Sequence, residues 1–203
     1  MTKEYDILVH FEKVDPILFA EAKRVGFHEM IPRKPEEYFA SLCREIVGQQ
    51  LSNKVARIIF GRFKDLVGEI TPEQVLSVSD QELRDVGMAW SKVRSIKDLA
   101  QKVASKELDL QLLNTLNEEQ IAEELIKVKG IGPWTTEMFL MFTLCREDIF
   151  SPGDLSLVRG ISKIYRIDRP TKEQIQEITN KWKPYRTYAS FVLWRSQEFY
   201  KYV

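Results

Sequence analysis

An aspartate on a tight turn is the first residue whose position suggests chemistry. Asp154 follows Ser151-Pro152-Gly153 and precedes an apolar, helix-like stretch, so its carboxylate is expected to cap a helix and to be held rigidly. Capping alone is a sufficient reason for an aspartate at this place. Upstream of it lies a glycine-rich turn, Gly130-Ile131-Gly132. A fixed carboxylate beyond a turn of this kind is suited to stabilising positive charge that develops during a reaction.

The glycine-rich turn has the composition of an anion-binding backbone. Gly130 and Gly132 allow backbone angles that a side chain would forbid, and Pro133 suits the first turn of a following helix. Ile131 can plug the junction between the two flanking helices. Backbone N–H groups at a helix N-terminus favour an anion, so we predict a clamp on a nucleic-acid phosphate. Two lysines beside the turn would add positive charge: Lys127 and Lys129. The alternative is an ordinary helical hairpin capped by glycine.

Helical periodicity predicts the elements that must position these residues, because apolar side chains recur at i, i+3 and i+4 along most of the chain. Asn117 with Gln120 and Thr171 with Gln174 form capping-box patterns. The predicted helices are 35–48, 52–68, two short ones after Thr71 and Ser79, 91–105, 118–127, 134–145, 155–165, 171–182 and 185–201. The one plausible strand is 6–11, which could equally be an extended arm.

These patterns predict an all-α fold of about ten short helices joined by tight turns. We expect two packed lobes of one domain spanning residues 1–203. One lobe is a helical bundle over 35–145 that contains the hairpin 117–145, and the other combines 1–34 with 146–203. No solenoid repeat, low-complexity tract or flexible linker is present in the sequence.

Composition is that of a globular protein, with 44% hydrophobic and 30% charged residues among 203. Thirty Lys and Arg balance thirty Asp and Glu, and a net charge of zero counts mildly against a nucleic-acid partner. The balance hides an asymmetry, because residues 151–203 hold ten basic and five acidic residues, a net charge of +5. This basic C-terminal quarter is a reason to look for a polyanion.

Cys43 and Cys145 are too few for a disulfide framework or a four-cysteine cluster, and neither has the neighbours of a zinc site. We expect both to be buried thiols in a reducing compartment. The sequence shows neither a signal peptide nor an apolar stretch long enough to span a membrane. We therefore expect an intracellular protein, in the cytoplasm of a bacterium or archaeon or in a eukaryotic nucleus.

Four segments resemble the helix-hairpin-helix DNA glycosylases, and among these the alkylation-repair branch of 3-methyladenine DNA glycosylase II type. They are CREIVGQQLSNKVA (43–56), VKGIGPWTTEMFL (128–140), FSPGDLSLVRG (150–160) and WKPYRTYASFVLWR (182–195). The resemblance spans roughly 35–200, and residues 1–34 take no part in it. It implies a compact two-lobed fold without the separate N-terminal β domain of some members.

The resemblance also implies roles for individual residues. Asp154 matches the catalytic aspartate, and Trp134 stands where members with lyase activity carry a lysine nucleophile. Tryptophan cannot form a Schiff base, so we expect a monofunctional enzyme that leaves the abasic site uncut. The base pocket is expected to contain Trp134, Tyr185 and Met138, the last where close members often place an aromatic residue.

The expected DNA contacts come from the same resemblance. Gln50 or Leu51 matches the wedge that fills the gap left by the flipped base, although Leu51 could equally pack in the core. Arg186 is a candidate phosphate contact. The hairpin amides of Gly130 and Gly132 would face phosphate, and carbonyl groups of 128–133 often hold a monovalent cation in this family. No cofactor and no catalytic metal are expected, and the partner is duplex DNA with a damaged base, bound by a monomer.

The expected reaction is excision of alkylated purines in base excision repair. Such a base is cationic and leaves easily, so it needs aromatic faces and an anion near C1′ rather than a general acid. Neither His10 nor His28 lies in a suggestive context. Two alternatives remain: a glycosylase for another lesion, such as hypoxanthine or an oxidised purine, and a non-catalytic module that binds distorted DNA.

Five aromatic residues at helical spacing are expected in the core: Phe139, Phe142, Trp182, Phe191 and Trp194. Trp90 has no assigned role.

Overall fold

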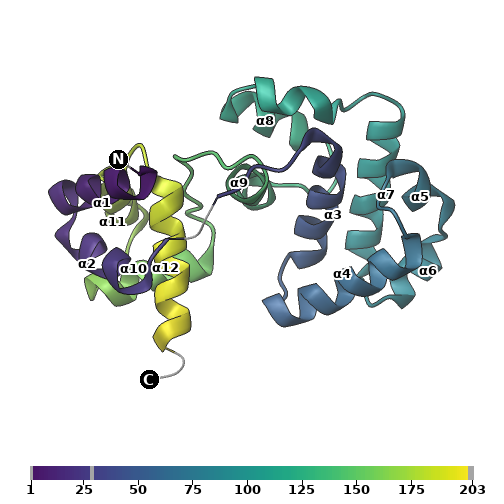
Figure 1. Cartoon of the computed structure of the whole chain (residues 1–203). Helices are drawn as coiled ribbons and strands as arrows, with labels where there is room; N and C mark the ends of the chain where they lie inside the picture. Colours follow the sequence, from purple (N-terminus) through teal and green to yellow (C-terminus); the bar gives the residue numbers. More distant parts are fainter. Residues whose placement is uncertain (1, 28–29, 201–203) are drawn as a thin grey trace. The chain divides into compact units, whose positions relative to one another are not determined.

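The computed structural model describes residues 2–27 and 30–200, so His28 lies outside the described part. Within that part the chain forms twelve α-helices and two 3-10 helices and no strand (Figure 1), which confirms the all-α prediction. The elements are α1 (Lys3–Val14), α2 (Pro16–Val25), η1 (Pro35–Glu37), α3 (Tyr38–Gly48), α4 (Asn53–Val67), α5 (Pro72–Ser77), α6 (Asp80–Asp85), α7 (Trp90–Ala104), η2 (Leu110–Thr115), α8 (Glu118–Leu125), α9 (Pro133–Phe142), α10 (Leu155–Tyr165), α11 (Lys172–Asn180) and α12 (Arg186–Tyr200).

The chain divides into two compact units, one formed by residues 1–31 with 145–203 and the other by 32–144. We call them the terminal unit and the central unit. Asp154 and Tyr185 belong to the terminal unit, and the hairpin and the turn that contains Gln50 belong to the central unit.

The prediction of a strand or arm at 6–11 is wrong, because these residues lie within α1. Thr2 caps the helix by accepting a hydrogen bond from the Tyr5 amide. Ile7 and Phe11 follow one another at helical spacing and are both almost fully buried. The β-branched residues in this stretch favour a strand locally. A helix forms instead because it buries Ile7 and Phe11 together in the core of the terminal unit.

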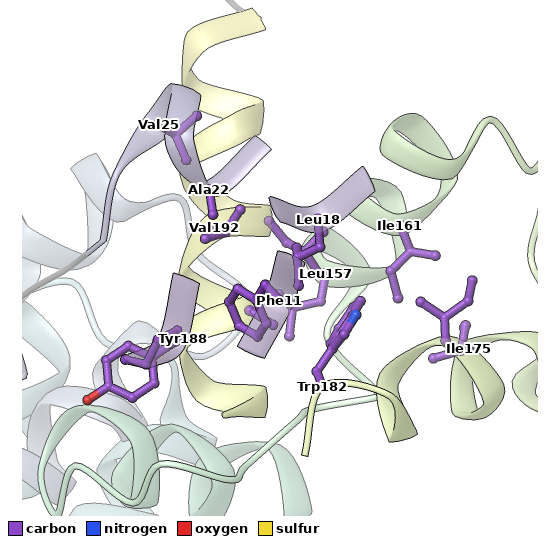
Figure 2. Close-up of a cluster of buried hydrophobic side chains, with 14 residues drawn as sticks. Phe11, Leu18, Ala22, Val25, Leu157, Ile161, Ile175, Trp182, Tyr188 and Val192 are labelled. Atoms are coloured by element: carbon purple, nitrogen blue, oxygen red, sulfur yellow. The ribbon is translucent and has the colours of Figure 1, made fainter. Parts of the chain in front are cut away.

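The core of the terminal unit joins helices from two distant parts of the sequence, α1 and α2 with α10, α11 and α12. Figure 2 shows side chains of α1, α2, α10 and α12 in one cluster, with Ile175 of α11 and Trp182 toward one side of it. α12 contacts both α2 and α10. Asp15, between α1 and α2, accepts hydrogen bonds from the Trp182 indole at 2.9 Å and the Tyr165 hydroxyl at 2.5 Å. A buried carboxylate with these donors ties the N-terminal helices to the rest of the unit.

In the central unit, α7 lies between α3 and the short helices α5 and α6 (Figure 1). α3 also contacts α4 and α9, and α8 contacts α9. Of the five aromatic residues expected in the core, Phe139, Trp182 and Phe191 are buried, whereas Phe142 and Trp194 are half-buried. Cys43 is buried as expected, but Cys145 is only half-buried because the helix that precedes it ends at Phe142 rather than at 145.

Candidate functional site

Gly130 has a conformation and an environment that only glycine fits. Its φ of +80° lies in the left-handed region, and a Cβ added to it would meet the Ser95 hydroxyl of α7 at 2.2 Å. Gly132 differs, because its φ is −124° and a Cβ there would meet no atom within 4 Å. The protein itself therefore does not require glycine at 132. The open space at Gly132 would allow another molecule to approach the backbone closely.

Two of the hairpin amides already donate to acceptors within the protein, so fewer amides are available to bind a phosphate. The Lys129 amide donates to the Asp98 carboxylate of α7 at 2.8 Å, and the Ile131 amide donates to the Val128 carbonyl at 3.1 Å. In the described chain we find no protein acceptor for the amides of Gly130 and Gly132. An anion at this turn would therefore be bound by the two glycine amides. Ile131 is a plug at the junction, since only 5% of its surface is exposed.

The two lysines beside the turn are accessible, although both already have an acidic neighbour. The Lys127 ammonium lies 2.7 Å from Glu124, and the Lys129 ammonium lies 3.6 Å from Asp98. The Lys129 side chain is 80% exposed. Exposed ion pairs of this kind are weak and exchange readily, so either ammonium can turn to a phosphate.

The carbonyl groups of the hairpin also have protein donors. Val128 accepts from the Ile131 amide, Gly132 from the Thr136 amide and Gly130 from the Gln49 side chain. A carbonyl oxygen has two lone pairs, so these bonds leave capacity for a cation. Neutral oxygen ligands suit a hard cation of low charge. The described residues contain no group of three or more His, Cys, Asp or Glu side chains placed to hold a metal. The predicted monovalent cation stays a prediction.

The turn between α3 and α4 lies against the hairpin. The Gln49 side-chain amide donates to the Gly130 carbonyl at 2.9 Å, which links segments that are 81 positions apart. The neighbouring Gln50 is exposed and has a φ of +57°, while Leu51 is half-buried. The central unit therefore brings together two of the segments that carry the resemblance. Gln50 is the more accessible of the two candidate wedge residues.

Asp154 is the N-cap of α10. Its Oδ1 accepts hydrogen bonds from the backbone amides of Ser156 at 2.8 Å and Leu157 at 2.9 Å. The Trp194 indole also approaches this oxygen, with Nε1 at 3.4 Å. The capping bonds fix the carboxylate at the start of the helix. The Trp194 contact was missed by the sequence analysis, which placed this residue in the core, and no local pattern identifies it.

Tyr185 contacts two residues of α1, His10 and Lys3, to which the sequence alone assigned no role. His10 lies edge-on to the Tyr185 ring with the ring centroids 5.3 Å apart, and the Lys3 ammonium lies 5.3 Å from the ring centroid. Tyr188 packs edge-on at 6.1 Å. Helix α1 therefore supports an aromatic ring that the resemblance places in the base pocket.

Arg186 is engaged inside the terminal unit. Its Nε donates to Oδ1 of Asp148 at 2.7 Å, and its Nη2 donates to Oδ2 at 3.1 Å and to the Asp148 carbonyl at 2.7 Å. This fork fixes the orientation of the guanidinium. Arg186 thus anchors the start of α12 through Nε and Nη2, and its contact with a phosphate stays a prediction.

Trp134 and Met138 lie one turn apart on α9. Trp134 is half-buried in the first turn of the helix, whereas Met138 is only 3% exposed. In the central unit Met138 therefore fills the core, and Trp134 is the more accessible of the two predicted pocket residues.

The fold and these residues define a helix-hairpin-helix DNA-repair protein. The chain belongs to the HhH-GPD superfamily of base excision DNA repair proteins, whose characteristic sequence matches residues 43–184. This confirms the family expected from the sequence motifs.

Named relatives agree with this membership. The chain is 33% identical over 172 residues to DNA-3-methyladenine glycosylase 1 of Schizosaccharomyces pombe, covering 82% of this chain and 75% of the relative. It is 34% identical over 162 residues to the putative DNA-3-methyladenine glycosylase YfjP of Bacillus subtilis, covering 75% of this chain and 56% of the relative.

Solved structures show the same fold over nearly the whole chain. The S. pombe 3-methyladenine DNA glycosylase in complex with abasic DNA superposes with a TM-score of 0.85 at 29% identity, covering 95% of this chain and 97% of that one. The DNA-3-methyladenine glycosidase of Bacillus halodurans superposes with a TM-score of 0.80 at 36% identity, covering 98% of this chain and 92% of that one. Among the described helices, none has the length and apolar character needed to cross a bilayer.

Proposed function

We propose that this chain is a monofunctional DNA N-glycosylase that excises alkylated purines of the 3-methyladenine and 7-methylguanine type from duplex DNA. The observation that carries the proposal is Asp154, whose carboxylate is fixed by two amides at the start of α10. The names of the relatives in both comparisons favour an alkylated purine as the substrate. The two units act as one domain, as a monomer and without a cofactor.

The reaction needs an anion more than it needs an acid. An alkylated purine is already cationic, so the bond from C1′ to the base nitrogen breaks with little assistance and leaves positive charge on the sugar. The Asp154 carboxylate stabilises that charge and orients the water that attacks C1′. The electron pair of the broken bond stays with the departing base, which leaves neutral, and the attacking water passes its proton to the bulk solvent as the new C–O bond forms.

The other residues bind and expose the base. The amides of Gly130 and Gly132 hold a backbone phosphate, and Gln50 enters the space that the base vacates. Trp134 and Tyr185 stack on the cationic base, and each such contact contributes about 0.5–2 kcal/mol. Since Trp134 has no amine to attack C1′, the abasic product is released uncut.

Base release from a set of duplexes tests the proposal. Each duplex carries one lesion, either 3-methyladenine, 7-methylguanine, hypoxanthine, uracil or 8-oxoguanine, and strand breaks are scored with and without alkali. We expect release of the two methylated purines, breaks only after alkali treatment and no borohydride-trapped adduct. Preferred release of another lesion would assign the enzyme to that lesion, and a trapped adduct would contradict the monofunctional mechanism.

Asp154→Asn tests the role of the carboxylate, because asparagine can still cap α10 while the charge is removed. We expect base release to fall by about 10²–10³-fold, the usual loss for an electrostatic group at a reacting centre. Asp168→Asn, an exposed change in the same unit, is the matched control. Near-normal release by Asp154→Asn would refute the mechanism, and binding of distorted DNA without release by the wild type would indicate a non-catalytic module.

A further inference from the structure

The turn between α3 and α4 has a backbone conformation that glutamine does not favour. Its ends are joined by a hydrogen bond from the Leu51 amide to the Gly48 carbonyl at 3.1 Å. Gln49 has φ −49° and ψ 129°, and Gln50 has φ +57°. These are angles typical of a type II turn, in which the position held by Gln50 normally carries glycine or asparagine. A strained residue in such a turn needs support from its surroundings.

Two side chains provide that support. The Lys92 ammonium of α7 donates to the carbonyls of Val47 at 2.8 Å and Gln49 at 2.6 Å, and so caps the end of α3. The Gln49 side chain donates one N–H to the Gly130 carbonyl at 2.9 Å and the other to the Thr135 hydroxyl at 2.8 Å. Because a carbonyl can only accept, the amide nitrogen of Gln49 must be the atom that faces Gly130.

The partners of Gln49 lie in the glycine turn and in the helix that follows it. Gly130 is in the turn itself, and Thr135 is buried in the first turn of α9. Helix α7 also contacts this turn. Ser95 lies close to Gly130, and Asp98 accepts a hydrogen bond from the Lys129 amide. The predicted phosphate clamp and the predicted wedge are thus connected by the side chain next to the wedge.

We infer that Gln49 is a positioning residue that holds the Gln50 wedge at a set place relative to the phosphate-binding hairpin. This inference rests on the proposed function. When the hairpin holds a phosphate, the Gln49 bridge keeps Gln50 aligned with the base pair to be opened. Loss of the bridge should therefore impair base flipping and leave the chemical step unchanged.

Single-turnover excision on two substrates separates these steps. One duplex carries 7-methylguanine opposite cytosine, and the other carries the same lesion opposite an abasic site, where no pair has to be broken. For Gln49→Met we expect about a tenfold loss on the paired lesion, as for two lost hydrogen bonds, and at most about a twofold loss on the unpaired one. The matched control is Gln101→Met, the same change at an exposed position of α7.

Each result decides the inference. Equal losses on both substrates, or no loss on either, would overturn it. Thermal unfolding of each variant checks that the fold is retained. If Gln49→Met does not fold, Thr135→Val takes its place, because it removes one partner of Gln49 at similar volume and should give a smaller loss with the same pair dependence.

The Gln50→Ala variant distinguishes failure of the inference from failure of the proposed function. Pair-dependent loss in Gln50→Ala but not in Gln49→Met would refute only the positioning role. Absence of that dependence in Gln50→Ala would refute the wedge assignment and the inference with it. Absence of release by the wild type from either duplex would refute the proposed function.

Discussion

The indole Nε1 of Trp194 donates to Oδ1 of Asp154 at 3.4 Å, across 40 positions of sequence. The same oxygen accepts the capping amides of Ser156 and Leu157. Helix α12 therefore contributes a donor to a carboxylate that α10 presents. A third donor on one oxygen restricts the orientation of the carboxylate more than capping alone.

Trp194→Phe keeps the ring and removes this donor. We expect base release to fall about three- to tenfold, the range for one hydrogen bond, while DNA affinity stays the same. Single-turnover excision and a binding titration check the two quantities. An unchanged excision rate would show that the two amides alone orient Asp154.

Gly130→Ala and Gly132→Ala form a matched pair, because the backbone and its surroundings require glycine at 130 but not at 132. Alanine at 130 meets the Ser95 hydroxyl and has a positive φ, so we expect the free energy of unfolding to fall by at least about 1–2 kcal/mol. Alanine at 132 should leave stability unchanged and weaken DNA binding, since only a ligand would meet the new methyl group. Urea unfolding and a binding titration compare the two variants. Equal destabilisation by both changes would contradict this assignment.

Asp15→Asn tests the buried carboxylate of the terminal unit. The Leu18 amide, the Tyr165 hydroxyl and the Trp182 indole all donate to Asp15, and burial together with Asp15 raises the pKa of Tyr165, which keeps its proton. An asparagine side chain has one oxygen that accepts and one nitrogen that only donates, so it cannot accept all three hydrogen bonds. We expect the free energy of unfolding to fall by about 1.5–3 kcal/mol, measured by urea unfolding against Asp168→Asn. A loss no larger than that of the control would show that Asp15 is not needed as a carboxylate.

Glu45 gives a pH dependence of stability. Burial raises the pKa of the Glu45 carboxyl, and Arg44, with Nη2 3.2 Å from it, offsets only part of this. A carboxyl whose pKa is higher in the folded state favours folding in its protonated form. That contribution is present below the unfolded pKa of about 4.3 and is lost as the pH rises through the folded pKa. Glu45→Gln, which mimics the protonated form, should therefore be more stable than the wild type at pH 8 and equal to it near pH 4. Urea unfolding at both pH values measures the difference, and a constant difference would contradict the shift.

Local interactions explain what could be predicted from sequence. Capping boxes at Asn117–Gln120 and Thr171–Gln174 were recognised because both partners lie within one helical turn, and the structure contains both. The position of Asp154 at the start of α10 was predicted for the same reason. The all-α fold follows from apolar periodicity over most of the chain. The stretch 6–11 was misjudged, since its β-branched residues conflict with a burial pattern that depends on distant helices. Helix α2 (Pro16–Val25) was not predicted, and α9 ends three residues before the predicted end at 145.

Tertiary structure alone decided which groups around the candidate site are already engaged. The Lys129 amide is used by Asp98, the Arg186 guanidinium by Asp148 and the Gly130 carbonyl by Gln49, over separations of 31, 38 and 81 positions. Spacing along the chain carries no information about such pairs, because they form only when packed helices bring their faces together. The sequence by itself determined the type of protein and its key turns. The packing of α7 and α12 determined which atoms of those turns are left to bind DNA.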